Sequence, residues 1–520
     1  MKREFMVKAI SENPDKVWDL IVIGGGATGL GTAVDATTRG YDTLLLEQYD
    51  FAKGTSSRST KLVHGGVRYL AQGDVSLVLE ALHERGLLRN NAPHLVKNLA
   101  FIIPNYEWWS GPFYALGMKV YDMMAGKLGL GPSEMISKEE TIEAIPNIKT
   151  EGLRGGVIYY DGQFDDSRLA INLAQTFSKN NGTIVNYFKV TGLLKNEDLV
   201  TGVNACDLEK GLEYEIKAKV VVNATGIFVD SIRRMDNKQN KNIIRLSQGV
   251  HLVLAKEFLK GDSAIMIPKT YDDRVLFAVP WHNRVILGTT DTPVDEPVLE
   301  PQALDEEVEY ILETAGRYLT RAPKRSDVLS VFAGLRPLAA TEDDNHTKEI
   351  SRSHQLMVSL SGLITVSGGK WTTYRKMGED TVDKVALVGG LEERPCITKN
   401  MPIHGYARNV QEIDHLQVYG SDRAAILQLI DDRPELAEKL HPNLDYIGAE
   451  VVWAVTEEMA RTVEDVLARR VRALFMDARA SIEMALKVAQ LMATEMNKDQ
   501  RWIDEQLEEY IALAGNYILE

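Results

Sequence analysis

The sequence predicts an α/β fold followed by an all-helical C-terminal region, and three observations support this prediction. A short apolar run from Leu20 to Ile23 leads into the glycine-rich stretch GGGATG, and small and apolar residues continue to Thr38. After residue 182, short β-rich runs separated by polar clusters replace this pattern. Beyond about residue 400, apolar residues recur at helical spacing.

The first elements are a strand, a glycine turn, a helix and a second strand. The helix is expected from Leu30 to Thr38, and the second strand from Thr43 to Glu47. This order is typical of the βαβ unit that opens a doubly wound sheet. A dinucleotide-binding fold is therefore expected almost at the N-terminus.

The middle of the chain predicts hairpins and a second sheet. Residues 182–226 contain the runs TIVNYF, LVTGVNA, YEIKA and KVVVNATG, which favour hairpins and a strand that returns to the first sheet. Residues 245–367 contain HLVLA, RVLFAVP, RVILGTT and QLMVSL, with a helix expected from Glu306 to Leu319. We expect these runs to form a mixed second sheet that caps the substrate.

The last part of the chain predicts a helical domain. Its helical spacing is carried by Ile482, Ala485, Leu486, Ala489, Met492, Ala493 and Met496. We therefore expect an interleaved, discontinuous cofactor- and substrate-binding region over residues 1–390 and a helical domain over residues 391–520.

Composition limits the classes of partner. The chain has 520 residues, 44% hydrophobic and 26% charged, which suits two or three domains with large cores. Its 59 basic and 74 acidic residues give a net charge of −15. This charge opposes binding to nucleic acid and to anionic lipid, so we expect no nucleic-acid partner, and an anionic substrate would need a local cationic pocket.

Cysteine and histidine usage argues against disulfides and metals. Cys206 and Cys396 are the only cysteines and lie outside any CxxC pattern. The ten histidines show no HExxH spacing, so no metal site is expected. The first nineteen residues do not resemble a secretory signal, and no run of about 18 apolar residues occurs. These features favour a cytoplasmic protein.

The glycine turn predicts a nucleotide site. Gly24, Gly26 and Gly29 form G-x-G-x-x-G between the strand and the helix, where backbone N–H groups can approach a pyrophosphate. Glu47 follows Gly24 by 23 residues and is the expected ribose-binding acid. The later NATG, ending at Gly226, is either a second contact with the dinucleotide or an ordinary turn. Together the two motifs favour a flavin.

Residues 50–70, DFAKGTSSRSTKLVHGGVRYL, closely resemble the flavin-contacting segment of FAD-dependent glycerol-3-phosphate dehydrogenases of the aerobic type. Further matches follow in order along the chain: APHL at 92–95, NATG at 223–226, GTTDTP at 288–293, GLRPL at 334–338, GGKWTTYR at 368–375 and RTVEDVLARRVRALFMD at 461–477. The resemblance implies a Rossmann-like FAD-binding domain, a mixed-sheet substrate domain and a helical C-terminal domain. It also implies oxidation of glycerol 3-phosphate to dihydroxyacetone phosphate.

The resemblance also implies which residues contact FAD. Besides the three glycines and Glu47, they are Thr55, Ser56, Ser59, Thr60, Lys61, His64, Gly65, Gly66, Val190, Gly226, Asp291, Gly369, Lys370, Trp371 and Thr372. Lys370 could also place positive charge near the substrate phosphate or the reduced flavin, whereas its alternative is a lysine at a helix entrance.

Substrate contacts are implied for a set of cationic and polar residues, namely Arg68, Tyr69, Arg336, Arg352 and Lys370. A guanidinium can hold phosphate oxygens through paired hydrogen bonds. His251 matches a substrate-site histidine, and an imidazole suits the acceptance of an alcohol proton. In isolation, a histidine before an apolar strand is more often structural.

The electron acceptor is left open by the residues themselves. Family dehydrogenases pass electrons to a membrane quinone, which implies a peripheral enzyme on the inner face of the cell membrane. Residues 106–126 group aromatic and methionine side chains that suit either a membrane interface or buried packing. The alternatives are an oxidase that uses dioxygen, an amine or amino-acid oxidase, and an inactive flavoprotein. Homo-oligomerisation is also left open.

Overall fold

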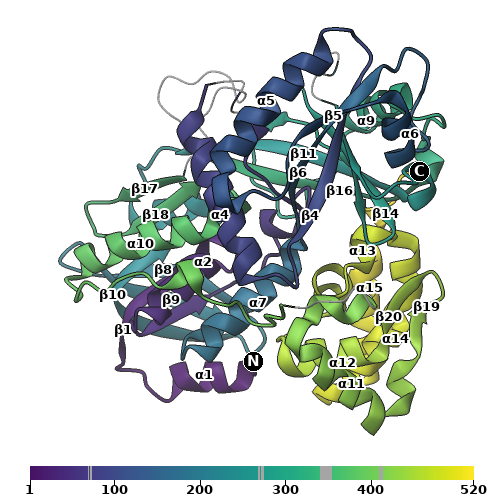
Figure 1. Ribbon diagram of the computed structural model, residues 1–520. Helices are drawn as coiled ribbons and strands as arrows, with labels where there is room; N and C mark the ends of the chain where they lie inside the picture. Colours follow the sequence, from purple (N-terminus) through teal and green to yellow (C-terminus); the bar gives the residue numbers. More distant parts are fainter. Residues whose placement is uncertain (68–69, 71–72, 268–269, 271–273, 340–353, 409–413) are drawn as a thin grey trace.

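Two large sheets and a helical C-terminal part form the molecule (Figure 1). The computed structural model describes residues 1–67, 70, 73–267, 270, 274–339, 354–408 and 414–520. The N-terminus lies near the first sheet, and the C-terminal helices, yellow-green in Figure 1, lie against one end of the second sheet.

The first sheet is mainly parallel and opens with the predicted βαβ unit. Its strand order is β17 (His354–Val358), β18 (Ile364–Gly368), β10 (Leu212–Asn223), β1 (Val17–Ile23), β2 (Thr43–Leu46) and β7 (Thr183–Val185), with β8 (Phe188–Asn196) and β9 (Leu199–Asp207) added beside β10. β1 pairs in parallel with both β10 and β2. Leu20 and Val22 belong to one core and Ile21 and Ile23 to another, because successive strand residues face opposite sides of the sheet.

Helices cover both faces of this sheet. They are α1 (Arg3–Ser11), α2 (Ala27–Thr38), α7 (Asp166–Lys179), α8 (Val229–Asp236) and α10 (Tyr374–Gly389). α2 and α10 approach closely through glycines. A Cβ on Gly31 would lie 2.7 Å from Tyr374 O, and a Cβ on Gly378 would lie 2.5 Å from Gly31 O. Only residues without a side chain permit this backbone contact.

The second sheet is mixed and contains ten strands in the described chain. Its order is β15 (Thr292–Val294), β11 (Ile244–Ala255), β14 (Arg284–Gly288), β13 (Leu276–Trp281), β12 (Ala264–Ile267), β4 (Lys97–Asn105), β6 (Gly155–Gln163) and β3 (Leu62–Val63), with β16 (Val328–Ala339) on β11 and β5 (Glu134–Ile136) on β6. The sequence placed QLMVSL in this sheet, and that prediction is wrong: His354–Val358 pairs with β18 in the first sheet. Strands β3 to β6 come from a part of the chain where no strand was predicted.

Further helices pack on the second sheet. They are α4 (Val75–Asn91), α5 (Ser110–Ala125), α6 (Lys138–Ala144) and α9 (Asp305–Tyr318), the last of which confirms the helix expected from Glu306 to Leu319. Val308, Ile311 and Ala315 of α9 share a core with Leu252 and Leu287 of the sheet. The spacing of these α9 residues places them on one helix face, which explains why α9 lies flat on the strands.

The C-terminal part is helical, as predicted. It contains α11 (Arg423–Asp432), α12 (Gly448–Glu457), the π-helix η10 (Asp465–Arg470), α13 (Ala473–Met476), α14 (Ala478–Met496) and α15 (Gln500–Gly515). A small hairpin, β19 (Lys439–His441) with β20 (Leu444–Ile447), was not predicted. Ala485, Ala489 and Met492 are buried, whereas Leu486 is 49% exposed. A domain boundary at residue 391 stays a prediction; α10 ends just before it, at a left-handed Gly390.

Short 3₁₀ helices join these elements. They are η1 (Thr55–Ser57), η2 (Gly126–Leu128), η3 (Gly226–Phe228), η4 (Lys256–Phe258), η5 (Arg325–Asp327), η6 (Trp371–Thr373), η7 (Thr398–Asn400), η8 (His415–Asp422) and η9 (Pro434–Ala437). Among the helices of the described chain, none is long and apolar enough to cross a bilayer.

Candidate active site

The glycine turn after β1 is shaped by backbone contacts. Gly24 has a φ of 110°, and a Cβ there would lie 2.6 Å from Ala224 O, in the NATG segment. A Cβ on Gly29 would lie 1.9 Å from Gly24 O. Gly26 is the N-cap of α2 and has no side chain to cap it, and Ser56 Oγ accepts a hydrogen bond from Ala27 N at 3.0 Å. The N-terminus of α2, with its partial positive charge, suits an anion such as a pyrophosphate.

Glu47 closes the other side of this turn. Its Oε2 accepts a hydrogen bond from Gly25 N at 2.6 Å, and its Oε1 accepts one from Tyr49 N at 2.9 Å. Burial raises the pKa of its carboxyl group above the ordinary value. Each carboxylate oxygen can accept further hydrogen bonds, so the group fits the hydroxyls of a ribose. The turn and Glu47 together fit the adenosine diphosphate part of FAD.

The segment from Thr55 to Gly66 is held between two elements distant in sequence. Thr55 Oγ1 donates to Leu335 O of β16 at 2.6 Å. Trp371 Nε1, in η6, donates to Ser56 O at 2.7 Å, and His64 N donates to Thr372 Oγ1 at 3.2 Å. The GTSSRST, GLRPL and GGKWTT motifs therefore meet in space.

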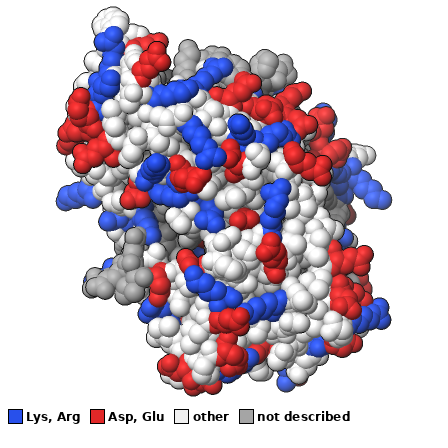
Figure 2. Space-filling view, turned by 90° about the vertical axis from the view of Figure 1, so that its right-hand side faces the viewer, with Lys and Arg blue, Asp and Glu red and all other residues white. Residues whose placement is uncertain are grey.

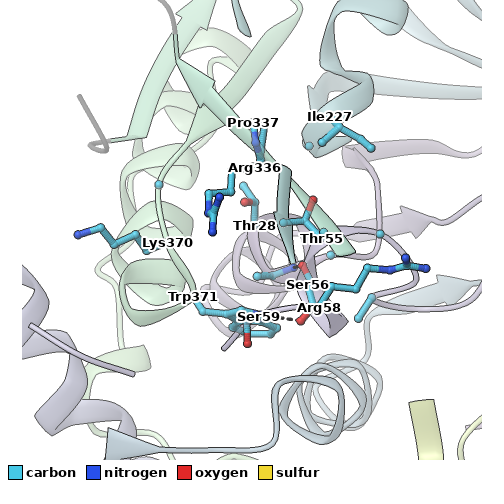
Figure 3. Close-up of a pocket in the computed structure, with 18 of the residues that line it drawn as sticks. Thr28, Thr55, Ser56, Arg58, Ser59, Ile227, Arg336, Pro337, Lys370 and Trp371 are labelled. Atoms are coloured by element: carbon cyan, nitrogen blue, oxygen red, sulfur yellow. Dashed lines mark hydrogen bonds between the residues drawn. The ribbon is translucent and has the colours of Figure 1, made fainter. Parts of the chain in front are cut away.

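These segments line one cavity of about 770 Å³ (Figure 3). Figure 3 shows side chains from the start of α2, from the 55–59 loop, from β16 and from the turn at Lys370 around it. The predicted residues that line it are Gly24, Gly26, Glu47, Thr55, Ser56, Ser59, Thr60, His64, Gly66, Val190, Gly226, His251, Asp291, Arg336, Gly369, Lys370, Trp371 and Thr372. Their individual roles stay predictions.

Three predicted cofactor residues do not line the cavity. Gly29 packs against Gly24, and Gly65 packs against α4, where a Cβ would lie 2.4 Å from a methyl group of Leu82. The Lys61 ammonium points to Asp166 Oδ2, at 2.7 Å, and has no exposed surface. These three residues therefore support the cavity wall instead of facing its contents. Arg68, Tyr69 and Arg352 lie outside the described residues.

His251, on β11, lies at the cavity wall and is 2% exposed. Its Nε2 shares a hydrogen bond of 2.9 Å with Thr60 Oγ1, and its ring stacks on Phe332 at a centroid distance of 4.8 Å. Burial lowers its pKa well below 6.5, and the positive charges of Lys61 and Arg336 lower it further. The imidazole is therefore neutral at pH 7, as a proton acceptor must be.

Arg336 on β16 presents its guanidinium to the same cavity. The group donates to Thr289 Oγ1 and to Thr290 O, both at 3.1 Å, and lies 3.9 Å from the Asp291 carboxylate. A Cβ on Gly249 would lie 2.3 Å from the guanidinium. A glycine at 249 is thus needed to leave room for Arg336 in this position.

The sequence did not point to the apolar end of the cavity. Phe101 and Tyr159 come from β4 and β6. Met266 comes from β12, Phe277 from β13 and Val275 from the position just before β13. Their signal was a set of β-like apolar runs, which does not reveal that distant strands pair. Thr28, Arg58, Arg274, Thr289 and Thr290 also line the cavity and were not singled out. In the described chain, no group of three or more His, Cys, Asp or Glu residues is arranged to hold a metal.

Comparisons with known proteins agree with this geometry. A family model described as FAD dependent oxidoreductase matches residues 19–375. A second model, the C-terminal domain of alpha-glycerophosphate oxidase, matches residues 381–502. The mitochondrial glycerol-3-phosphate dehydrogenase of Homo sapiens is 39% identical over 526 residues, covering 94% of this chain and 72% of the human protein. A probable mitochondrial glycerol-3-phosphate dehydrogenase of Caenorhabditis elegans is 40% identical, covering 92% of this chain and 70% of its own length.

Solved structures extend the comparison to the whole fold. The glycerol-3-phosphate dehydrogenase of Bacillus halodurans, complexed with FAD, matches with a TM-score of 0.82 and 30% identity over 100% of this chain and 98% of that chain. An L-alpha-glycerophosphate oxidase of Mycoplasma pneumoniae matches with a TM-score of 0.57 and 16% identity over 75% of this chain and 99% of its own, which supports the fold alone. The predicted fold class and the predicted FAD cofactor are confirmed. The chain belongs to the family of FAD-dependent glycerol-3-phosphate dehydrogenases.

Proposed function

We propose that this protein oxidises sn-glycerol 3-phosphate to dihydroxyacetone phosphate and passes the electrons to a quinone. The observation that carries the proposal is a single cavity in which Arg336 and the neutral His251 lie beside the glycine turn and Glu47. A cation for a phosphate and a proton acceptor for an alcohol are the two groups that this substrate requires. Family membership supports the same substrate.

The oxidation removes a hydride from C2 and a proton from the hydroxyl group, and the site offers a group for each. Bound FAD supplies the two-electron acceptor that takes the C2 hydrogen as hydride. Arg336 holds the phosphate and thereby sets the distance from the substrate anchor to the reacting carbon. His251 accepts the hydroxyl proton, and Thr60 fixes the orientation of its ring. Lys370, Arg68, Tyr69 and Arg352 are proposed as further substrate contacts.

Replacing Arg336 by Ala is expected to weaken the substrate and spare the cofactor. The loss of charge-assisted hydrogen bonds to phosphate should lower kcat/KM about 10- to 100-fold. Anaerobic reduction of the visible flavin absorbance by sn-glycerol 3-phosphate, followed over a range of substrate concentrations, measures this loss, and a separate titration measures FAD affinity. Arg284→Ala is a matched control, because Arg284 lies on β14 of the same sheet and its guanidinium donates to Asn443 O, outside the cavity. Equal losses of substrate and FAD affinity in R336A would contradict the phosphate role.

The same anaerobic experiment tests the substrate itself. Bleaching of the flavin by sn-glycerol 3-phosphate in wild-type protein is the expected result. An unchanged spectrum in FAD-loaded protein would remove this substrate, and bleaching by an amino acid instead would assign the protein to the amine and amino-acid oxidases.

The apolar end of the cavity supports a lipophilic electron acceptor. Phe101, Tyr159 and Met266 line the cavity and belong to one apolar cluster with Met118 of α5. Tyr114, also in α5, packs against this cluster. An apolar wall with few polar groups suits the ring of a quinone. Dioxygen would need no such wall, so this feature favours the dehydrogenase over the oxidase.

The outer face of α5 supports contact with a bilayer. Trp109, Phe113, Leu116, Val120 and Met123 recur at helical spacing and are exposed by 49%, 62%, 70%, 41% and 81%. Trp108, at the start of this stripe, is 78% exposed. Figure 1 places α5 at the upper edge of the molecule, away from the C-terminal helices. The exposed stripe lies on the same helix, α5, whose Met118 packs at the apolar end of the cavity. Such an exposed apolar face suits a peripheral enzyme on the inner face of the cell membrane.

A double variant of the α5 stripe is expected to slow electron transfer to a quinone held in a bilayer, but not to a quinone dissolved in water. Trp108→Ser/Phe113→Ser should slow reoxidation of the substrate-reduced protein by ubiquinone in phosphatidylcholine vesicles at least about tenfold, because two apolar side chains are lost from the bilayer contact. Reoxidation by a water-soluble quinone analogue should not change. Leu360→Ser, at an exposed apolar residue outside α5, is the control. Unchanged rates with vesicles would exclude the α5 face, and equally fast reoxidation by air would favour the oxidase.

A further inference from the structure

A buried ion pair lies behind the loop that lines the cavity. The Lys61 ammonium and the Asp166 carboxylate are 2.7 Å apart, and neither side chain has exposed surface. Lys61 also donates to Ser57 O at 2.8 Å. Its ammonium lies 5.1 Å from the ring centre of Phe332 and 5.4 Å from that of Phe475. A lysine enclosed in this way acts on the cavity through its neighbours.

The Asp166 carboxylate fastens the loop through several donors. Its Oδ2 accepts hydrogen bonds from Ser59 N at 3.1 Å and from Ser59 Oγ at 2.7 Å, besides that from Lys61. Its Oδ1 accepts one from Arg472, at 3.2 Å. Arg472 also donates to Ser57 O, at 2.8 Å. Residues 57, 59 and 61 are thus fixed from behind by α7 and by the C-terminal part of the chain.

Thr60 stands between two of these fixed residues and faces the other way. It lines the cavity, and its hydroxyl shares the hydrogen bond with His251 Nε2. Phe332, which stacks on the His251 ring, is also one of the aromatic rings that face the Lys61 ammonium. The edge and one face of the imidazole are therefore set by groups that contact or adjoin Lys61.

We propose that Lys61 is a positioning residue for His251: its ammonium, fixed by Asp166, holds the turn that presents Thr60 to the imidazole ring, and its positive charge acts on that ring. The proposal rests on the proposed function, in which His251 accepts the substrate proton. It gives Lys61 a role that does not require contact with substrate or FAD.

The charges around the two groups determine the sign of the effect. His251 faces the positive charges of Lys61 and of Arg336 on β16. Lys61 interacts with Asp166 of α7, with Asp165 at the N-cap of α7, and with Arg472 from the C-terminal part. His282 lies 3.7 Å from Asp165. Burial lowers the pKa of Lys61 to about 8, against the effect of Asp166, so the ammonium keeps its charge at neutral pH. Removal of this charge raises the pKa of His251, because protonation then meets less repulsion.

Three variants separate charge from shape. Lys61→Met removes the cation. Lys61→Met/Asp166→Asn removes the cation and its counter-ion together, which avoids an unbalanced buried charge and retains an oxygen for Ser59. Lys61→Arg keeps a cation. Each FAD-loaded protein is reduced anaerobically by sn-glycerol 3-phosphate over a range of pH, and its FAD affinity is measured separately by fluorescence titration.

The wild-type rate of flavin reduction is expected to fall only on the acid side, below the ordinary histidine range. In Lys61→Met, this acid limb should move to higher pH by about one unit; in the double variant it should move in the same direction by less, because the negative charge of Asp166 is lost as well; in Lys61→Arg it should stay in place. FAD affinity should be unchanged in the double variant. A purely structural role would lower stability or FAD affinity without moving the limb.

His251→Asn distinguishes failure of this inference from failure of the proposed function. If His251→Asn leaves the acid limb in place, His251 is not the proton acceptor and the proposed function loses its base. If His251→Asn removes the limb while both charge-removing variants leave it at the wild-type pH, Lys61 does not act on His251 and the inference is overturned. A shifted limb in all three Lys61 variants, Lys61→Arg included, would equally contradict the charge argument.

Discussion

Replacing Gly29 by Ala is expected to lower FAD affinity about 100-fold. The added Cβ would lie 1.9 Å from Gly24 O and 3.0 Å from Gly24 C, so the backbone of the phosphate-binding turn itself must move. Overpacking against a group that cannot rotate away costs about 3 kcal/mol, which corresponds to about two orders of magnitude in affinity. The flavin content of the purified protein and a titration of the apoprotein with FAD measure the effect.

Gly117→Ala provides the matched control for this variant. Gly117 lies in α5, outside the residues that line the cavity, and a Cβ there would meet no atom within 4 Å. Its FAD affinity should remain that of the wild type. A Gly29→Ala protein that retains full FAD affinity would show that the turn can move without cost, and the close approach of α2 to β1 would then not be needed for the cofactor site.

Replacing Arg470 by Met is expected to destabilise the protein by about 3–5 kcal/mol, because it leaves a buried carboxylate with one cation fewer. Arg470 donates twice to Asp50, at 2.8 and 2.9 Å, and both side chains have no exposed surface. Arg469 donates to the same carboxylate at 2.5 Å. Urea unfolding, followed by fluorescence, measures the loss.

The effect should reach the cofactor as well as the fold. Asp50 follows Glu47 by three residues, and Lys53, which lines the cavity, pairs with Glu464 at 2.7 Å. The cofactor loop is thus held by charges from the C-terminal part. Arg501→Met is the control, since Arg501 pairs with Glu505 on an exposed face of α15, and little change is expected. If the two variants unfold at the same urea concentration, the contact between Arg470 and Asp50 does not stabilise the protein.

The Asp50 contact also predicts how stability depends on pH. Burial opposes ionisation of Asp50, but Arg470 and Arg469 outweigh it and lower its pKa. A carboxyl group with a lowered pKa stabilises the folded state above the unfolded pKa of about 4, and this contribution is lost as the pH falls through the folded value. Arg470→Met should therefore lose less stability than the wild type between pH 5 and the acid end, by an amount that the same unfolding experiment measures.

The distribution of surface charge bears on how the anionic substrate is attracted. Figure 2 shows acidic and basic side chains mixed over the visible face. A mixed surface does not concentrate a field of one sign, so an anionic substrate is attracted by the cations of its own cavity, such as Arg336, more than by the exterior.

Local features of the chain were predictable wherever one short segment decides the structure. The turn at Gly24, the helix after it and the acid at Glu47 depend on missing side chains and on apolar periodicity within about two dozen residues, and these are visible in the letters. The spacing of apolar residues likewise predicted the C-terminal helices. The family resemblance added the motifs around Arg336 and Trp371. Sequence spacing alone does not predict that these motifs lie together in the fold.

Pairing between distant segments was not predictable in the same way. QLMVSL reads as a strand, but nothing in its pattern says whether it joins the first sheet or the second. Lys61 shows the same limit for a side chain: it sits in a cofactor motif, yet its φ of 63° and its partners place the ammonium behind the loop. The sheet partner and the buried counter-ion are long-range choices, made by whichever packing buries most apolar surface and leaves fewest charges unpaired.

The sequence by itself determined a nucleotide-binding turn with its ribose acid, a mixed β region and a helical end, because each depends on local backbone sterics and periodicity. Only the tertiary structure decided that His251 shares a hydrogen bond with Thr60, that Lys61 pairs with Asp166, and that Arg470 pairs with Asp50 in the loop after Glu47. The physical reason is distance along the chain: hydrogen bonds and ion pairs act over a few ångströms, and only folding brings residues hundreds of positions apart within that range.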